Sequence, residues 1–180
     1  VTESQPQQEC PPPRTREAVD CWLRKWGRDA AADGTEPLTR EDVERLIQAN
    51  GGTAEKLNLE RRDLRGANLY LADLQGADLF EAKLQGATLV FAKLQGAYLA
   101  DAKLQGACLT DAKLQGAYLM GADLQGAYLG GANLQNTRLW NADLQGADLR
   151  HANLDGADFE GFATVRLTNM EGVRLYGATI

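Results

Sequence analysis

Leucine recurs at every fifth position through most of the chain, and from Leu69 onward the residue two positions before each leucine is small and usually alanine. The series runs from Leu64 to Leu154 and continues into Phe159. An α-helix does not fit this period, because five residues advance about 500° around the helix axis and successive leucines share no face. A continuous β-strand does not fit either, because an odd step places alternate leucines on opposite faces. The pattern therefore predicts a repeat architecture built from shorter pieces.

Each repeat is predicted to be a short extended piece followed by a turn, with Ala and Leu pointing into a coil. Repeats that end in Gln-Gly alternate with repeats of varied residues, and this alternation stacks in register only if a coil has an even number of sides. Two sides leave no room for leucines, so we expect four sides, about twenty residues per coil and about 4.8 Å between layers. One column of the predicted core is Leu64, Leu84, Leu104, Leu124 and Leu144.

The repeat Ala-Asp-Leu-Gln-Gly, as at residues 72–76, resembles the pentapeptide-repeat family, whose signature is a small residue, a polar residue, Leu or Phe and two more. The resemblance covers roughly residues 57–180. It implies a right-handed β-helix with four sides, in which the central Leu and the preceding small residue stack inside. The expected fold class is therefore an all-β solenoid, a right-handed quadrilateral β-helix of about six coils over residues 53–180, with a small helical cap before it.

Residues 1–52 are predicted to form a tail and this cap. Residues 1–14 contain Pro11-Pro12-Pro13 and lack a hydrophobic pattern, so we expect a disordered tail, with a proline-recognition ligand as the alternative. Residues 15–52 contain two amphipathic helices. The first runs from Thr15 to about Arg28 and carries a stripe formed by Val19, Trp22, Leu23 and Trp26. The second begins at Thr39, with Asp42 completing a capping box, and ends at Gly51-Gly52. We expect these helices to cover the first coil; an independent binding domain is the alternative.

The repeat register shifts by one residue near Phe159, because the next centre would fall on Thr164. One inserted residue within 160–162 restores an apolar series at Val165, Met170, Leu175 and Ile180. The sequence has no closing helix after this series, so either the chain is truncated or the open coil meets another protein. We expect an end-to-end homodimer through this C-terminal coil.

Stacking at a spacing of twenty gives the coil four outer walls. Two walls carry Gln with Asp, Lys or Asn and are predicted to be solvated, with stacked amides bonding up the column. The other two carry aromatic residues, which indicates contact with a partner; shielding of the β-ladder is the alternative. The candidate interaction surface is Phe80, Tyr98, Tyr118, Met120, Arg138 and Trp140. A secondary surface on the opposite wall is Tyr70, Val90, Phe91 and Tyr128, with Cys108 in the same wall.

Charge and hydropathy exclude several classes of partner. The net charge is −6, to which residues 1–55 contribute −4 and residues 56–180 only −2. A repeat region so close to neutral argues against direct binding of nucleic acid. The sequence has no run of eighteen apolar residues, so we expect no membrane span.

The cysteines leave the compartment open. We favour free thiols in a reducing cytosol, and the alternative is an exported protein in which Cys10 and Cys21 form a disulfide. Because the chain begins at Val1 rather than Met, we expect a processed form in which any signal peptide has been removed.

The sequence predicts no catalytic, metal-binding or cofactor-binding site. A solid interior of Leu and Ala offers no concavity in which reactive groups converge. The chain has one serine, Ser4, and one histidine, His151, so a serine triad would need both, and Ser4 lies in the predicted tail. One histidine and three scattered cysteines do not make a zinc site.

Two non-enzymatic functions remain. The first is a protein-interaction or scaffold module whose partner the sequence does not identify. The second is a DNA-mimicking inhibitor or protector of a topoisomerase such as gyrase, which the resemblance to quinolone-resistance members of the family implies. Against mimicry, residues 56–180 have a net charge of only −2, with Lys83 and Lys103 on one polar wall and Lys93 and Lys113 on the other.

Overall fold

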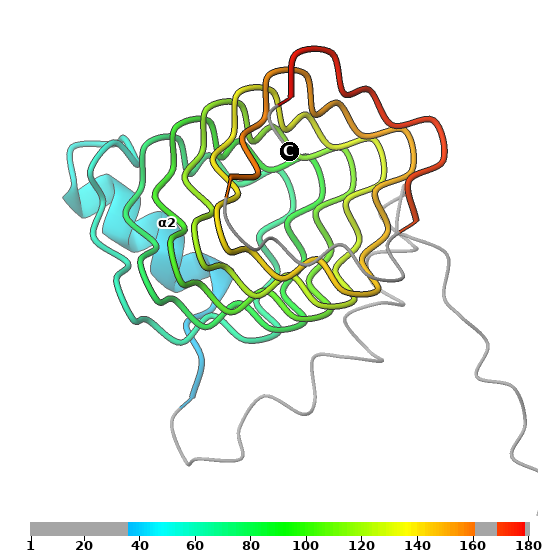
Figure 1. Cartoon of the computed structure of the whole chain (residues 1–180). Coiled ribbons are helices and arrows are strands. Elements are labelled where there is room, and N and C mark those ends of the chain that lie inside the picture. The colour runs from blue at the N-terminus through cyan, green and yellow to red at the C-terminus, as the bar shows by residue number, and fades with distance from the viewer. Residues whose placement is uncertain (1–35, 161–168, 179–180) are drawn as a thin grey trace, which may run out of the picture.

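The computed structural model describes residues 36–160 and 169–178. Among these residues, one helix lies at the end of a stack of rectangular coils (Figure 1). The predicted tail at 1–14, the predicted helix at 15–28 and the candidate pair Cys10 and Cys21 lie outside the described residues.

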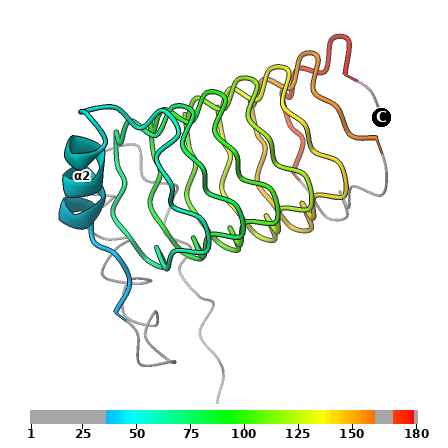
Figure 2. The same ribbon diagram turned by 90° about the vertical axis from the view of Figure 1, so that its left-hand side faces the viewer.

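The helix, α2, spans Arg40–Ala49 and has the predicted capping box. The backbone N–H of Thr39 donates to Asp42 Oδ2 over 2.9 Å, and the N–H of Asp42 donates to Thr39 Oγ1 over 3.3 Å. Two residues with positive φ, Gly51 and Gly52, follow the helix, and the N–H of Gly52 donates to the Ile47 carbonyl. α2 lies across the first coil (Figure 2), where its Val43 is 1% exposed and belongs to the same buried cluster as Leu59.

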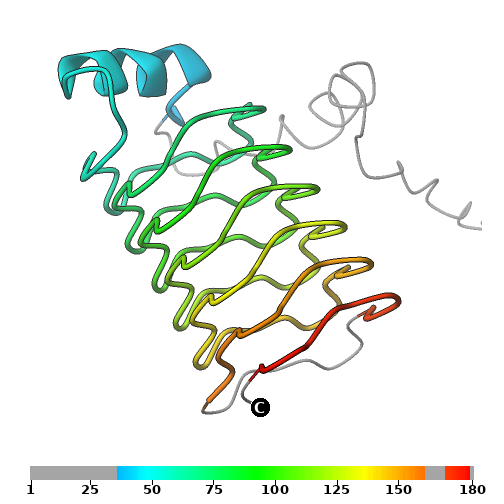
Figure 3. The same ribbon diagram turned by 90° about the horizontal axis from the view of Figure 1, so that it is seen from above.

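The coils are held together by parallel bridges between residues twenty apart, which establishes four five-residue sides per coil. In one column, Lys83 bridges Lys103 and Lys103 bridges Asp123. The N–H of Lys103 donates down to the Ala82 carbonyl over 2.9 Å, and its carbonyl accepts from Leu84 over 2.7 Å. Each side contributes one bridging residue, so the β-structure is a stack of very short parallel pieces (Figure 3).

Each corner is a β-turn whose second central residue has positive φ. Leu64 to Ala67 shows the pattern, because the Leu64 carbonyl accepts from the Ala67 N–H over 3.1 Å and Gly66 has φ 63°. On the two Gln-bearing walls this corner is usually glycine. On the other two walls the same position usually holds a non-glycine residue, such as Leu71 with φ 58° and Phe91 with φ 55°, with glycine at Gly121 and Gly131.

Where the residue before a central leucine is Asp or Asn, it shapes the following turn. Its side-chain oxygen accepts the backbone N–H two residues on, as Asp143 Oδ1 does from Gln145 over 2.9 Å and Asn153 Oδ1 does from Asp155 over 3.1 Å. This Asx turn gives a backbone reason for the Asp and Asn at this position.

The interior is a stack of leucine and alanine side chains. All five leucines of the predicted core column, Leu64, Leu84, Leu104, Leu124 and Leu144, are at most 1% exposed. The predicted register shift is present, because Asp148 bridges Asn169 and Asn153 bridges Arg174, at a spacing of twenty-one. In this last described coil, Met170 and Leu175 are 37% and 38% exposed. Val165 and Ile180 lie outside the described residues.

Replacing Leu114 with Asp tests the inward assignment. Leu114 is fully buried between coils above and below, so a carboxylate there loses its hydration and gains no partner, at a cost of more than about 4 kcal/mol. We expect Leu114→Asp to abolish the cooperative thermal transition in circular dichroism. Lys113→Asp, at the exposed neighbouring position, is the matched control and should melt almost as the parent does. Retained cooperative melting of Leu114→Asp would contradict the assignment.

Replacing Leu71 with Asn should stabilise the protein. Leu71 holds a positive φ while its side chain is 55% exposed, so it carries the backbone cost without much compensating burial. Asn tolerates this conformation, and we expect a gain of about 0.5–1 kcal/mol in the free energy of unfolding by urea. Leu71→Ala removes the same apolar surface but keeps the unfavourable φ. Equal stabilities of the two variants would show that φ is not the cause.

Candidate interaction surface

One outer wall of the coil brings together all six residues of the candidate interaction surface. We call it the aromatic wall and define it by two vertical rows. The bridging row is Asp78, Tyr98, Tyr118 and Arg138, each bridged to the next. The turn row is Phe80, Ala100, Met120 and Trp140, each following a central leucine.

The aromatic rings of this wall form one continuous stack. The Phe80 and Tyr98 ring centroids lie 5.9 Å apart at an interplanar angle of 28°. The Tyr98 and Tyr118 centroids lie 5.8 Å apart at 52°. The spacing follows from the fold, because residues one coil apart are held near the inter-strand distance by the bridges between them.

An arginine lies over the aromatic ring at each end of the stack. The Arg138 guanidinium carbon is 4.5 Å from the Tyr118 centroid, and that of Arg61 is 5.7 Å from the Phe80 centroid. Both distances are within the range of cation–π attraction. Arg138 was among the predicted residues and Arg61 was not. The sequence does contain a signal for Arg61: it lies twenty residues before Glu81, which directly follows Phe80. In the structure Arg61 and Glu81 form an ion pair over 2.8 Å.

The aromatic wall exposes much of its apolar and aromatic area. Tyr98 is 38% exposed and Trp140 is 41% exposed, Arg138 is exposed, and Phe80, Tyr118 and Met120 are half-buried. The small Ala100, between larger neighbours, is buried. The wall therefore offers flat rings and one guanidinium to an outside molecule.

The opposite wall is arranged differently. We call it the Cys108 wall; its bridging row is Asn68, Thr88, Cys108, Tyr128 and Asp148, and its turn row is Tyr70, Val90, Thr110, Gly130 and Arg150. Tyr70 and Phe91, which occupies a corner, meet edge to face at 6.1 Å.

The prediction that the secondary surface is exposed is wrong at Val90. Val90 and Cys108 are both 0% exposed and form a small buried cluster, against which the half-buried Tyr70, Phe91 and Tyr128 pack. Burial raises the pKa of the Cys108 thiol, whose sulfur lies 3.4 Å from Thr110 Oγ1. The secondary surface is therefore a covered patch with aromatic edges.

The two polar walls carry charges near solvent but lack the predicted amide stack. The side-chain amide of Gln125 donates to Asp143 Oδ2 over 2.6 Å, and that of Gln105 donates to Asp123. Four glutamine Oε1 atoms are buried without a hydrogen-bond partner, those of Gln85, Gln95, Gln105 and Gln115. The prediction of glutamines bonding to one another is wrong for these four residues, whose side-chain oxygens accept no hydrogen bond. For the amide N–H groups of Gln105 and Gln125, carboxylates one coil above are the stronger acceptors.

The described residues hold no cluster of three or more His, Cys, Asp or Glu side chains that could bind a metal ion.

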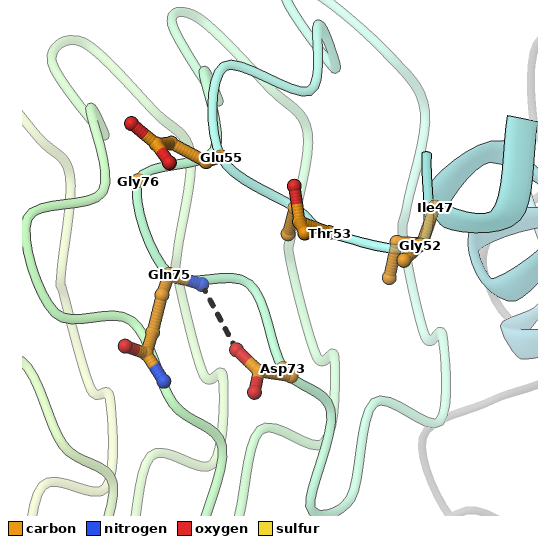
Figure 4. Close-up of a pocket in the computed structure, with 8 residues that line it drawn as sticks. Ile47, Gly52, Thr53, Glu55, Asp73, Gln75 and Gly76 are labelled. Atoms are coloured by element: carbon orange, nitrogen blue, oxygen red, sulfur yellow. Dashed lines mark hydrogen bonds between the residues drawn. The ribbon is translucent and has the colours of Figure 1, made fainter. Parts of the chain in front are cut away.

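A depression lies where the end of α2 meets the first coils, between Ile47 and Gly76 (Figure 4). Within it, Asp73 accepts the backbone N–H of Gln75 over 3.4 Å and also pairs with Lys93 at 2.9 Å. The Asp73 carboxylate in this depression is therefore already used by the turn and by the ion pair with Lys93. No helix among the described residues is long and apolar enough to cross a membrane.

A stack of four-sided coils with a leucine interior defines a β-solenoid of the repeat class. A family model for pentapeptide repeats, in eight copies, matches residues 55–86, 82–121 and 122–161. These matches extend over more than half of the chain, and the chain belongs to the pentapeptide repeat family.

Solved structures of the same family are similar to this chain. A pentapeptide repeat protein from the thylakoid lumen of Arabidopsis thaliana is 29% identical, over 61% of this chain and 65% of that one, with a TM-score of 0.34. QnrB1, a plasmid-mediated fluoroquinolone resistance protein, is 22% identical, over 67% of this chain and 63% of that one, with a TM-score of 0.51. HetL from the cyanobacterium Nostoc, involved in heterocyst differentiation regulation, is 25% identical, over 79% and 92%, with a TM-score of 0.33. No curated protein matches.

Replacing Asp63 with Asn should make part of the stability independent of acid. The Arg65 guanidinium, 2.9 Å from Asp63 Oδ1, lowers the pKa of the Asp63 carboxyl, and both side chains are largely buried. A lowered pKa in the folded state stabilises at pH values above the unfolded pKa, and this stabilisation disappears as the pH falls through the folded pKa.

We therefore expect Asp63→Asn to cost about 1–2 kcal/mol at neutral pH and almost nothing in strong acid, measured by urea unfolding across pH. Asp73→Asn is the comparison, because the Asp73–Lys93 pair is half exposed and its loss should matter less. A constant difference for Asp63→Asn at every pH would exclude the ionic explanation.

Proposed function

We propose that this protein is a non-enzymatic interaction module and that the aromatic wall is the surface that binds its protein partner. The observation that supports this most is the exposure of Tyr98, Trp140 and Arg138 on one flat wall. Tyrosine, tryptophan and arginine are the residue types that contribute most of the binding energy at protein interfaces.

The wall is well suited to binding because it is already ordered. The ring stack from Phe80 to Tyr118 and the Arg138 guanidinium are held in place by their neighbours one coil away. Side chains fixed before binding lose little conformational entropy when a partner arrives. The shielding alternative requires only that rings cover the ladder, and it gives no reason for Trp140 to remain 41% exposed.

The two ends of the coil stack have different roles in this proposal. α2 serves as the cap of the first coil, supported by the burial of Val43, and the winding is right-handed, as in the family. The other end is the contact of an end-to-end homodimer, supported by exposed Met170, Leu175 and Tyr176, the last 87% exposed. A sedimentation experiment in which the full chain stays monomeric at high concentration would contradict the homodimer.

Mimicry of DNA at a topoisomerase is the second candidate function. Its support is the likeness to QnrB1, which at 22% identity concerns the fold. Lysines weaken it, because Lys93 and Lys113 stack on one polar wall and Lys83 and Lys103 on another. A gyrase supercoiling assay separates the two proposals: inhibition or protection from quinolone at micromolar protein favours mimicry, and no effect favours the interaction module.

Replacing Tyr118 and Trp140 with Ser tests the aromatic wall. We expect the double variant to keep its circular dichroism spectrum, because both side chains lie outside the leucine core, and to lose at least about tenfold in partner affinity. The measurement is quantitative affinity capture from the source organism, comparing what the parent and variant retain. Lys93→Ser with Lys113→Ser, on a polar wall, is the matched control. Equal capture by the wall variant and the parent would overturn the proposal.

A further inference from the structure

The Cys108 wall contains four neighbouring wall side chains that are as buried as the leucine core. Thr88, Val90, Cys108 and Thr110 occupy wall positions and are all 0% exposed. On the aromatic wall the bridging-row residue corresponding to Thr88 and Cys108 is Tyr98, which is 38% exposed. Wall positions are sealed from solvent only when something lies over them. The described neighbours that pack on Val90 and Cys108 are the edge aromatics Tyr70, Phe91 and Tyr128.

A polar atom in this patch also lacks a partner. Thr88 Oγ1 is buried and makes no hydrogen bond. A buried hydroxyl without a partner costs free energy, so a cover that brings a donor would suit this position better than a purely aliphatic one.

We propose that residues 15–28 of this chain, which lie outside the described residues, dock on the Cys108 wall as an amphipathic helix. Their stripe of Val19, Trp22, Leu23 and Trp26 would face the patch. The two indole N–H groups of this stripe are donors of the kind that Thr88 Oγ1 lacks. The proposal concerns a contact within the chain and is independent of the partner proposed for the aromatic wall.

The described chain begins beside this wall. The N–H of Leu38 donates to the Asp63 carbonyl over 2.7 Å. Arg40 Nη1 donates over 2.7 Å to the carbonyl of Tyr70, which lies one coil below Val90. The segment before residue 36 therefore enters at the foot of the wall, next to the edge of the patch.

The lengths are compatible with docking. Residues 29–35 can span up to roughly 23 Å when extended, while two coils rise about 10 Å. A fourteen-residue helix from 15 to 28 is about 21 Å long, which is enough to span the roughly 14 Å that the wall rises over three coils from Tyr70 to Tyr128. Such a helix would cover the four buried side chains and leave Cys21, Arg24 and Arg28 on its outer face.

The Cys108 thiol reports whether the cover is present. In a full-length Cys10→Ser, Cys21→Ser background, Cys108 is the remaining thiol, and we expect its reaction with maleimide to be slow at every protein concentration. Adding Trp22→Ser and Trp26→Ser should speed it by roughly a hundredfold or more, because opening no longer removes two buried indoles. The circular dichroism of the coil should not change.

Arg24→Ser with Arg28→Ser changes the outer face of the same segment and is the matched control, with no expected effect on labelling. If the double tryptophan variant does not fold, Leu23→Ser tests the same stripe with a smaller increase, roughly tenfold. Rapid labelling without the tryptophan changes, or a rate that these changes leave unaltered, would overturn the proposal. Protection that disappears on dilution would also overturn it and would identify a second copy as the cover.

Discussion

The hydrogen bonds between residues twenty apart are the constraint on which this structure depends. A bridging residue makes both of its backbone hydrogen bonds to the coil below, as Lys103 does with Ala82 and Leu84. Asp123, in the coil above, bonds in the same way to the residues on either side of Lys103. An isolated coil would have neither set of bonds, so no coil is stable without its neighbours. The leucines are buried by the same stacking, since each Leu and Ala contacts its equivalents one coil away. Hydrogen bonding and apolar burial are therefore gained together as the stack grows.

This constraint also gives the four walls their separate characters. Every outward side chain has a fixed neighbour one coil away, so a column can carry one kind of chemistry along its whole length. The Gln-Gly corners of the polar walls supply positive φ without strain. On the aromatic wall, Arg61 and Glu81 hold positive φ without being glycine. In return, these two residues form an ion pair, and Arg61 lies over the first ring of the stack. Backbone cost at the corners and contacts between wall side chains are thus set by the same residues.

The fold could be predicted because its determinants are local and repeated. The fivefold spacing of Leu64 and its successors allows one inward direction. The tenfold Gln-Gly alternation requires an even number of sides, and the volume of the leucines makes that number four rather than two. The shift near Phe159 could be located because a single polar residue, Thr164, interrupted the apolar series. The capping box at Thr39 rests on two residues in the right spacing. Each of these predictions needs only sequence distance, which the repeat converts directly into position.

The sites were harder to predict because they depend on what lies outside the coil. Spacing placed Tyr98, Tyr118 and Arg138 in one row, and the structure brings them into contact. The same spacing placed Val90 and Cys108 on a wall, yet they are buried. The repeat spacing determines the direction in which a side chain points, but it does not determine what covers that side chain. The glutamine columns failed for a related reason: spacing aligned the amides, but the carboxylates of Asp123 and Asp143 one coil above compete for their donors. A repeat therefore predicts its interior with few additional assumptions, whereas each wall must be understood from the chemistry of the residues that meet there.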